Sequence, residues 1–420
     1  MSRWKFLEVP LNNIHYNFNH MNLNKICSVK DKNILFLQGP MGSFFARLEK
    51  MFLEKGANTF RIGLNAGDYF FALKHAYTPY RDTLDAWPDF ITGYLQEKKI
   101  DTIFVFGDCR LYQSVAIYAA KNLGIDVMVF EEGYIRPNYI TMERYGVNDY
   151  SHLPRDPEFY RALERKERPS ALSVESSGFL LSYSAVLYYT FANIFSWRYP
   201  YYQHHRSFSA YKELKLAARN LYRKYLYAYQ ERHECERVTR EYSKNYFFVP
   251  LQTHNDFQIL QHSIYRSIEV FIEDVVSSFA AHAADEQMLI FKHHPVDRGR
   301  KDYSGFIYAV ACKYGVETRI KVYHDVHLPT LLKNALGTVT INSTVGLSSL
   351  FHMTPTLTMG NAVYGVKGLT AGAEELDEFW KERAPVDTAL FERFEQYLIE
   401  NTQINGSFYG KLFLDEEEYC

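Results

Sequence analysis

The sequence has few cysteines and none of the spacings that bind metals. Its five cysteines lie far apart in a chain of 420 residues, at Cys27, Cys109, Cys235, Cys312 and Cys420. Without a Cys-x-x-Cys pair or a Cys/His ligand pattern, neither a structural zinc site nor a disulfide framework is expected, which fits a reducing compartment. The first residues, MSRWKFLEVPLNN, also lack the apolar core of a secretory signal. We therefore expect a cytoplasmic protein with no metal site.

Net charge is also low. The formal value of -2 gives the chain no overall attraction to nucleic acid or to a membrane. Nucleic acid is therefore not expected as a partner, and membrane contact would have to come from a local patch. The hydrophobic fraction of 47% and the charged fraction of 23% are typical of a globular protein. The length is sufficient for two domains, each with its own core.

Short apolar runs alternate with amphipathic segments along most of the chain. NILFLQG (33–39) and DTIFVFG (101–107) predict buried strands, and PMGSFFARLEKMFLEKG (40–56) predicts a helix between strands. The pattern restarts at NYFFVPLQ (245–252) and continues through EQMLIFKHHP (286–295). Such alternation predicts an α/β protein with parallel sheets in two Rossmann-like domains. We place them at 30–165 and 246–380, with C-terminal helices at 381–420.

Residues 166–245, between the two blocks, predict a helical insertion rich in aromatic and basic residues. SSGFLLSYSAVLYYTFANIFSW (176–197) carries no charge, and residues 198–244 hold eleven Lys and Arg against five Glu. Aromatic and hydroxyl side chains beside a basic helix are typical of a peripheral membrane dock. The alternatives are an inter-domain insert whose aromatics are buried in the core, and a transmembrane span, which the dispersed Ser, Thr and Asn disfavour.

Polar residues of the first block follow its predicted strands, where open α/β sheets bind ligands. In LQGPMGSFF, Gln38 and Gly39 form a loop between strand and helix that is either a ligand loop or a tight turn. Asn65 and Asp68 in NAGDYFF follow another strand. We group these four residues with Arg136 as candidates for an acceptor site or cleft.

Two adjacent glutamates end a buried strand in FEEGYIRP. A partly desolvated carboxyl group has a raised pKa and can serve as a general acid or base, so Glu131 and Glu132 are catalytic candidates. The alternative is a solvated loop with a helix-capping glutamate. Successive side chains of a strand point to opposite faces, so the sequence does not choose between the two.

Three motifs of the second block suit an acidic ligand. FKHHPVDRG places cationic and titratable side chains at one strand end, and INSTVG places hydroxyls at a helix start, where backbone N–H groups bind anions. LQTHND offers a carboxylate that could be a nucleophile or a base. The alternatives are a metal site at the histidines, which is weaker because adjacent histidines of a strand point to opposite faces, and plain structural roles: an Asx-turn, ordinary loop histidines and an N-cap. The candidates are Gln252, Asp256, Lys292, His294, Pro295, Arg298, Asn342, Ser343 and Thr344.

Six of these motifs, in order along residues 33–372, resemble the KpsS/LipB family of capsular polysaccharide biosynthesis proteins. They are LFLQGPMGSFF, GLNAGDYFF, FEEGYIRP, LQTHND, FKHHPVDRG and INSTVG. The resemblance implies a GT-B glycosyltransferase that transfers the acidic sugar Kdo from CMP-β-Kdo to a phosphatidylglycerol-type lipid. That step starts the β-Kdo linker of a capsule. It implies work at the inner-membrane surface with other capsule biosynthesis proteins, and no cofactor beyond the donor.

The resemblance also implies roles for single residues. His294, Ser343 and Thr344 would hold the CMP phosphate. Gln252 and Asp256 match a Gln-x-x-x-Asp element of related retaining β-Kdo transferases, so Asp256 would be the nucleophile. Either glutamate of Glu131-Glu132-Gly133 would be the acid/base, although related enzymes read Glu-Asp-Gly there. The remaining alternatives are a transferase for another CMP-activated acidic sugar, such as CMP-sialic acid, and a non-catalytic capsule assembly protein.

Overall fold

The computed structural model describes residues 29–166, 171–174, 178–204, 210–253, 265 and 267–410. Two sheets organise them. The N-terminal sheet has seven strands in the order β12 (Gln403–Asn405), β6 (Tyr139–Arg144), β5 (Asp126–Glu132), β4 (Thr102–Phe106), β1 (Asn33–Phe36), β2 (Asn58–Gly63) and β3 (Tyr77–Pro79). The C-terminal sheet has five in the order β11 (Thr356–Thr358), β10 (Gly337–Thr340), β7 (Tyr246–Pro250), β8 (Met288–Lys292) and β9 (Ile320–Tyr323).

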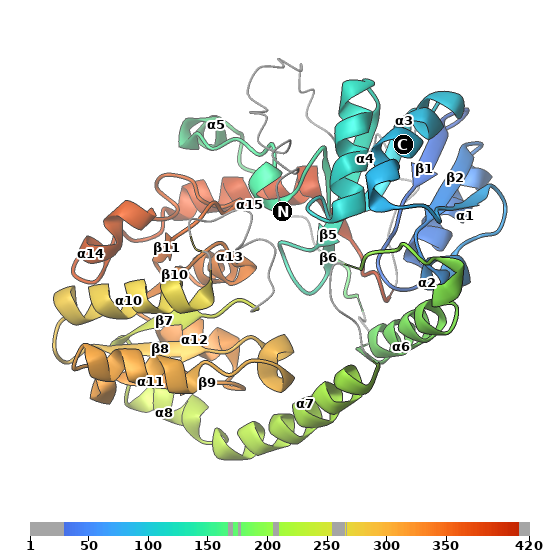
Figure 1. Ribbon diagram of the computed structural model, residues 1–420. Helices are drawn as coiled ribbons and strands as arrows, with labels where there is room; N and C mark the ends of the chain where they lie inside the picture. The colour runs from blue at the N-terminus through green and yellow to red at the C-terminus, as the bar shows by residue number, and fades with distance from the viewer. Residues whose placement is uncertain are drawn as a thin grey trace.

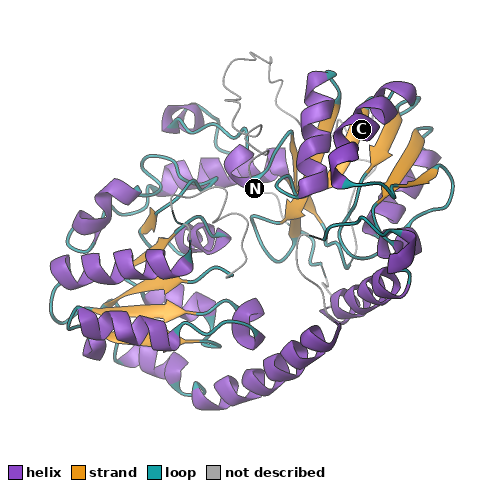
Figure 2. Cartoon of the chain, in the orientation of Figure 1, coloured by secondary structure: helices purple, strands orange, loops and turns teal. Residues whose placement is uncertain are grey.

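Every pairing in the C-terminal sheet is parallel, and in the N-terminal sheet only β6 runs against its neighbours. Helices cover both faces of each sheet (Figure 2), as parallel strands require. The result confirms the predicted fold class, an α/β GT-B-like architecture of two Rossmann-like halves joined by a helical insertion (Figure 1). The antiparallel strand β6 was not predicted, because it follows β5 after a short polar turn and reads as loop.

The helices around the N-terminal sheet are α1 (Phe44–Glu54), α2 (Ala66–Phe71), α3 (Trp87–Glu97), α4 (Leu111–Asn122) and α5 (Pro157–Arg161). The insertion holds α6 (Gly178–Ile194), α7 (Ala210–Gln230) and α8 (Glu234–Arg240). The remaining helices are α10 (Ile268–His282), α11 (Ser304–Lys313), α12 (Leu328–Asn334), α13 (Thr344–Phe351), α14 (Leu376–Phe379) and α15 (Thr388–Thr402).

Alternation along the strands builds a core on each face of both sheets. In β7, Phe247 and Val249 face the cluster with α10 and α11, whereas Tyr246 and Phe248 face α8 and α12. In the N-terminal sheet, Leu35 of β1 packs with α3 and α4, and its neighbours pack against the aromatic face of α1. Strands buried on both faces read as unbroken apolar runs, which is why the sequence predicted them well.

A further core joins the two halves. Tyr134 and Tyr160 come from the first half. They pack with Leu350 of α13, with Phe394 of α15, and with Tyr364, which lies between β11 and α14. Helix α15 then continues into β12, which pairs antiparallel with β6. Residues 381–420 were expected to be helical, but within their described part the helix α15 is followed by the strand β12. With three residues, QIN, that strand is too short to show a sequence pattern.

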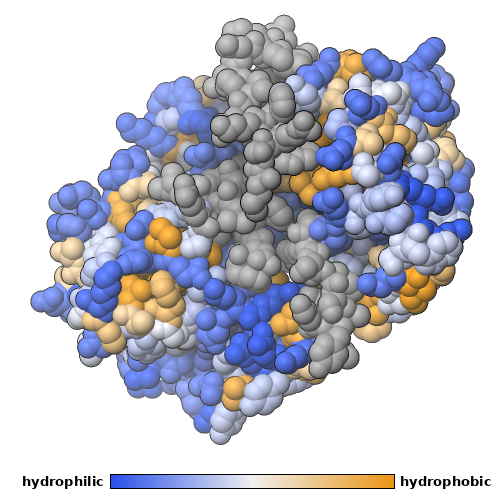
Figure 3. Space-filling model, viewed as in Figure 1, coloured by the Kyte–Doolittle hydropathy of each residue, from blue (hydrophilic) through white to orange (hydrophobic). Residues whose placement is uncertain are grey.

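Several of the described aromatics of the insertion are exposed. Phe179 is 75% exposed, Trp197 71% and Tyr225 69%, whereas Tyr188 is buried. The alternative of an insert whose aromatics are buried in the core is therefore wrong for these exposed residues, whereas Tyr188 and Tyr199 fit it. Along the lower edge of Figure 3, where α6 and α7 run, isolated hydrophobic residues lie among hydrophilic ones. Among the helices of the described residues, none combines the length and the apolar character that crossing a bilayer requires.

A buried ion pair links α1 to β2, and its removal tests the packing of the N-terminal sheet. Both Nε and Nη2 of Arg61 donate to Oε2 of Glu49, at 2.9 and 2.8 Å, and both side chains are buried. Glu49→Ala leaves the guanidinium buried without a countercharge, which should cost about 3–5 kcal/mol. Thermal unfolding should show a clearly lower midpoint.

The adjacent exposed pair between Lys50 and Glu54 supplies the control. Lys50→Ala should change stability by less than about 1 kcal/mol. Equal effects of the two substitutions would contradict the packing described for Glu49.

Candidate functional site

Three predicted residues of the first half, Gln38, Asn65 and Asp68, come together in a buried hydrogen-bond network. The Asp68 carboxylate accepts hydrogen bonds from Gln38 Nε2 at 3.1 Å and from the Tyr188 hydroxyl at 2.8 Å. It also accepts from the backbone N–H groups of Leu64 and Asn65. Burial raises the pKa of Asp68, although these hydrogen bonds oppose the shift. Since Tyr188 belongs to α6, this network anchors the insertion to the strand ends.

The other two acceptor candidates lie differently. Gly39 packs against Phe45, where a Cβ atom would lie 2.6 Å from the ring. Arg136 is exposed and its Nε donates to the Gly133 carbonyl at 3.1 Å. The acceptor role of this group stays a prediction.

The structure distinguishes the two adjacent glutamates. Glu132 is exposed, whereas Glu131 is half-buried at the end of β5. Burial raises the pKa of Glu131 to about 7, although the Glu132 backbone N–H and Arg110 act against the shift. A carboxyl group with a pKa near neutrality can both donate and accept a proton at physiological pH. Glu131 therefore fits the acid/base role better than Glu132.

The loop after β4 shapes the surroundings of Glu131. Gly107 has a φ of +73°, and a Cβ atom there would lie 3.4 Å from Arg110 Nε and 3.7 Å from Glu131 Oε2. A glycine is thus favoured where Arg110 and Glu131 approach the turn. Arg110 was not among the predicted site residues, although GDCR follows a buried strand and the strand-end rule would have selected it.

A second carboxyl group of the first half also has a pKa raised by burial to about 7, that of Glu143 on β6. The Tyr134 hydroxyl donates to Glu143 Oε1 at 2.6 Å, and the Ser151 hydroxyl donates to Oε2. Because both oxygens are hydrogen-bonded and the side chain is buried, Glu143 holds the loop after β6 in place. Its raised pKa therefore does not make it an acid/base candidate.

In the second half, the predicted residues follow three neighbouring strands. The sheet order β10-β7-β8 sets the ends of these strands side by side. Gln252 follows β7, and its Nε2 donates to Asn342 Oδ1 after β10 at 2.9 Å. Ser343 caps α13, its Oγ accepting from the Val345 N–H at 3.2 Å, and Thr344 is the first residue of that helix. Asp256 lies outside the described residues.

The strand end of β8 carries the His-Pro motif. Nδ1 of the half-buried His294 accepts from the Val296 N–H at 3.2 Å, and Pro295 begins the 3-10 helix η6 (Pro295–Gly299). Lys292 is buried and its Nζ donates to the His324 carbonyl at 2.7 Å. Burial lowers the pKa of Lys292. Arg298 forms an ion pair with Asp325. Two of the predicted cations are therefore already engaged with the protein.

Helix α7 holds the segment after His294 from outside. Arg219 Nη2 donates to the Arg300 carbonyl and Arg223 Nη1 to the Arg298 carbonyl, each at 3.0 Å. At Gly299 a Cβ atom would lie 2.5 Å from the backbone oxygen of Leu216 in α7, so only glycine permits this approach. The sequence analysis missed these contacts, because they join residues about 80 positions apart.

An open pocket of about 840 Å³ lies between the two halves. Residues 149–155 line one side and 358–374 the other. Gly360 in its wall donates its N–H to the Ile341 carbonyl at 3.0 Å, so the pocket begins beside the end of β10. Of the predicted site residues within the described ranges, none lines this pocket. His152 and Arg155, which do, were not predicted.

Fold and strand-end residues together define a GT-B-like protein with polar groups gathered where its parallel strands end. The family model "Capsule polysaccharide biosynthesis protein" matches residues 101–409, and the chain belongs to this family. The predicted family resemblance is thus confirmed.

Among similar proteins, the capsule polysaccharide export protein KpsS of Escherichia coli is 39% identical over 90% of this chain and 97% of its own length. The capsule polysaccharide modification protein LipB of Neisseria meningitidis serogroup A is 37% identical over 91% of this chain and 93% of its own. The match to the solved structure of the β-Kdo 2,7 transferase KpsC of Thermosulfurimonas dismutans covers 86% of this chain and 98% of that chain. The sequence identity is 14% and the TM-score is 0.38. An overlap this loose does not bear on the activity of this chain.

The raised pKa of Glu131 predicts a pH-dependent stability. In the unfolded chain this carboxyl group loses its proton near its ordinary pKa of 4.5, but in the folded chain only near about 7. Folding is thus favoured while the group is protonated, and that contribution is lost as the pH rises from about 4.5 through about 7. We therefore compare the midpoint of thermal unfolding of Glu131→Gln with that of the unsubstituted chain at two pH values. The difference, variant minus unsubstituted chain, should be more positive at pH 8 than at pH 5.

Glu132→Gln removes a neighbouring exposed carboxylate and is the matched control. If the difference in unfolding midpoint between Glu131→Gln and the unsubstituted chain does not change with pH, the raised pKa of Glu131 is contradicted.

Proposed function

We propose that the protein is a retaining glycosyltransferase that transfers Kdo from CMP-β-Kdo to a phosphatidylglycerol-type lipid. The product would be the start of the β-Kdo linker of a capsular polysaccharide. Membership of the capsule polysaccharide biosynthesis family supports the pathway. The observation that carries the proposed chemistry is that Ser343, Gln252 and His294 follow the carboxyl ends of three adjacent strands, β10, β7 and β8.

That edge suits the phosphate of a CMP-sugar. Adjacent parallel strands lie about 4.8 Å apart, so groups after three neighbouring strands can reach one phosphate. The N-terminus of α13, with Ser343 and Thr344, provides N–H groups and hydroxyls for an anion. His294 would add a donor from the other side. Lys292 and Arg298, held by His324 and Asp325, would act by fixing the loop and by their positive field.

The reaction would proceed in two displacements. The Asp256 carboxylate attacks the anomeric carbon, the bond to the CMP oxygen breaks, and CMP leaves with the electron pair. The lipid hydroxyl then attacks the same carbon, Glu131 takes its proton, and the aspartate leaves as a carboxylate. Two inversions give net retention. With a pKa of about 7, Glu131 is substantially ionised at physiological pH and can accept that proton.

Replacement of the nucleophile and of the phosphate ligand tests this proposal. Asp256→Asn should lower transfer from CMP-Kdo to a short-chain phosphatidylglycerol at least about 10³-fold, because the covalent step is lost. His294→Ala should lower it about 10²-fold, because a donor to the leaving phosphate is removed. Mass-detected product formation measures both.

His327→Ala, an exposed histidine on the same half, is the control and should leave transfer unchanged. Transfer from CMP-sialic acid instead of CMP-Kdo would favour the alternative of another acidic sugar. Full capsule formation by both variants in cells, at normal protein levels, would instead favour a non-catalytic assembly protein.

A lipid acceptor gives the exposed aromatics of the insertion a role, and we propose that they dock the protein on the anionic inner-membrane surface. Phe179 and Tyr183 lie on α6, Trp197 follows it, and Tyr222 and Tyr225 lie on α7; all five are exposed. Aromatic side chains favour the headgroup region, and the basic residues of α7 attract anionic lipid. Because α7 also contacts the segment after His294, docking would hold the donor site near the surface.

Flotation with vesicles tests the dock. The intact chain should float with vesicles of phosphatidylglycerol and phosphatidylcholine, and less so at high salt. Phe179→Asp with Tyr183→Asp should reduce bound protein about tenfold or more, because charge replaces apolar contact. Tyr118→Asp, on exposed Tyr118 of α4, should have no effect. Failure of the intact chain to float would remove the membrane proposal.

A further inference from the structure

Two histidines and an aspartate meet behind the His-Pro loop, in a group that the proposed reaction does not use. His293 directly follows β8, His324 directly follows β9, and Asp302 lies just before α11. Since β8 and β9 are parallel neighbours, their carboxyl ends bring the two rings together, with centroids 4.4 Å apart. Asp302 Oδ1 lies 3.6 Å from His293 Nε2 and 3.9 Å from His324 Nε2.

The arrangement of this group suits a metal. The three ligand atoms lie within 4.8 Å of one another. His293 is only 4% exposed, and the imidazole nitrogen of histidine is the commonest metal ligand in proteins. Nε2 of His324, one of the proposed ligand atoms, is buried and has no hydrogen-bond partner among the described residues. Unsatisfied buried nitrogens are uncommon in native structures and require an explanation.

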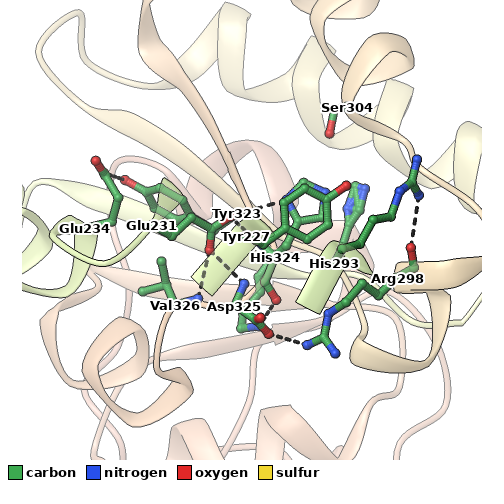
Figure 4. Close-up of polar contacts among 12 residues, drawn as sticks. Tyr227, Glu231, Glu234, His293, Arg298, Ser304, Tyr323, His324, Asp325 and Val326 are labelled. Carbon is green, nitrogen blue, oxygen red and sulfur yellow. Dashed lines mark hydrogen bonds and ion pairs between the residues drawn. The ribbon is translucent and has the colours of Figure 1, made fainter. Parts of the chain in front are cut away.

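The surroundings supply an orienting partner for one ring. His324 Nδ1 lies 3.3 Å from Glu231 Oε1, and the ring stacks on Tyr227 with centroids 3.9 Å apart (Figure 4). A carboxylate on one ring nitrogen directs the other toward a metal and is the usual companion of a ligating histidine. Glu231 is itself fixed by the backbone N–H groups of Asp325 and Val326, at 2.7 and 3.0 Å.

We propose that His293, Asp302 and His324 form a binding site for one divalent transition-metal ion, with Glu231 orienting His324. Two imidazoles and one carboxylate match zinc best, with a water as fourth ligand on the partly accessible side of Asp302. Ligand atoms of tetrahedral zinc, at bonds of about 2.0–2.1 Å, lie roughly 3.3 Å apart. The observed separations of 3.6 and 3.9 Å from Asp302 Oδ1 to the two imidazole nitrogens are close to that spacing.

Metal binding exchanges one hydrogen bond. The Tyr303 N–H now donates to His293 Nε2 at 2.9 Å, and a metal at that nitrogen displaces it. Metal coordination replaces a single neutral hydrogen bond at that atom. The other oxygen of Asp302, Oδ2, faces α7 and accepts a hydrogen bond from the Tyr227 hydroxyl at 3.4 Å.

The position of the site indicates a structural role for the metal. Successive side chains of extended backbone point to opposite sides, so His293 and His294 diverge and the metal lies away from the donor phosphate. It lies instead between the strand ends and α7, through Tyr227 and Glu231. A metal there fastens α7 to the C-terminal sheet. This inference does not depend on the proposed function, because it requires neither donor nor lipid.

Metal titration of the full chain tests the site. After removal of metal by chelator and dialysis, the chain should bind about one equivalent of Zn²⁺, and Co²⁺ should show the visible absorption of a tetrahedral site. His324→Gln and Asp302→Asn should weaken binding at least tenfold. Glu231→Gln should weaken it about 10–100-fold. His327→Gln, three residues from His324, is the matched control and should bind as the unsubstituted chain does.

Zn²⁺ should also raise the midpoint of thermal unfolding of the intact chain but not of Asp302→Asn. This comparison decides the matter if His324→Gln does not fold. Absence of Zn²⁺ and Co²⁺ binding by the intact chain overturns the proposal, and so does binding that both Asp302→Asn and His324→Gln retain.

Discussion

The parallel pairing of strands in the C-terminal sheet is the constraint on which the candidate site depends. Parallel strands need crossover helices on both faces, and they bring all their carboxyl ends to one edge. Gln252 and Asn342 are 90 residues apart in the chain, yet they hydrogen-bond at 2.9 Å because β7 and β10 are neighbours. The same constraint places His293 beside His324. One geometric rule thus gathers the residues of both the donor edge and the histidine group.

The second constraint is the return of the chain to its first half. Helix α15 packs in the core that joins the halves, and β12 then extends the N-terminal sheet beyond β6. Gln403 of β12 accepts a hydrogen bond from the Tyr134 N–H at 3.1 Å, just after Glu131 and Glu132. The loop that follows the acid/base candidate is therefore held by β12, which lies about 270 residues further along the chain.

The sequence predicted the features that depend on local pattern. Buried strands such as β7 and β8 read as apolar runs, and the strand-end rule selected Gln252, His294 and Ser343. It did not distinguish Glu131 from Glu132, because burial at a strand end is set by the neighbouring loop with Gly107 and Arg110. It did not show that Asp68 would be enclosed by Tyr188, which lies 120 residues away. Pairings between distant segments carry no periodic signal, so only the folded chain shows them.

Lys292 and Arg298 already contact other parts of the protein, and this limits how the negative charge of the donor phosphate can be balanced. Lys292 is buried and donates to the His324 carbonyl, and Arg298 is paired with Asp325, so either side chain would have to break its contact with the protein to reach a ligand. Under the proposed function, the described residues that meet the phosphate are chiefly His294 and the start of α13. One phosphate, as in CMP, needs fewer countercharges than the pyrophosphate of other nucleotide sugars. The engagement of Lys292 and Arg298 is therefore compatible with the proposed donor.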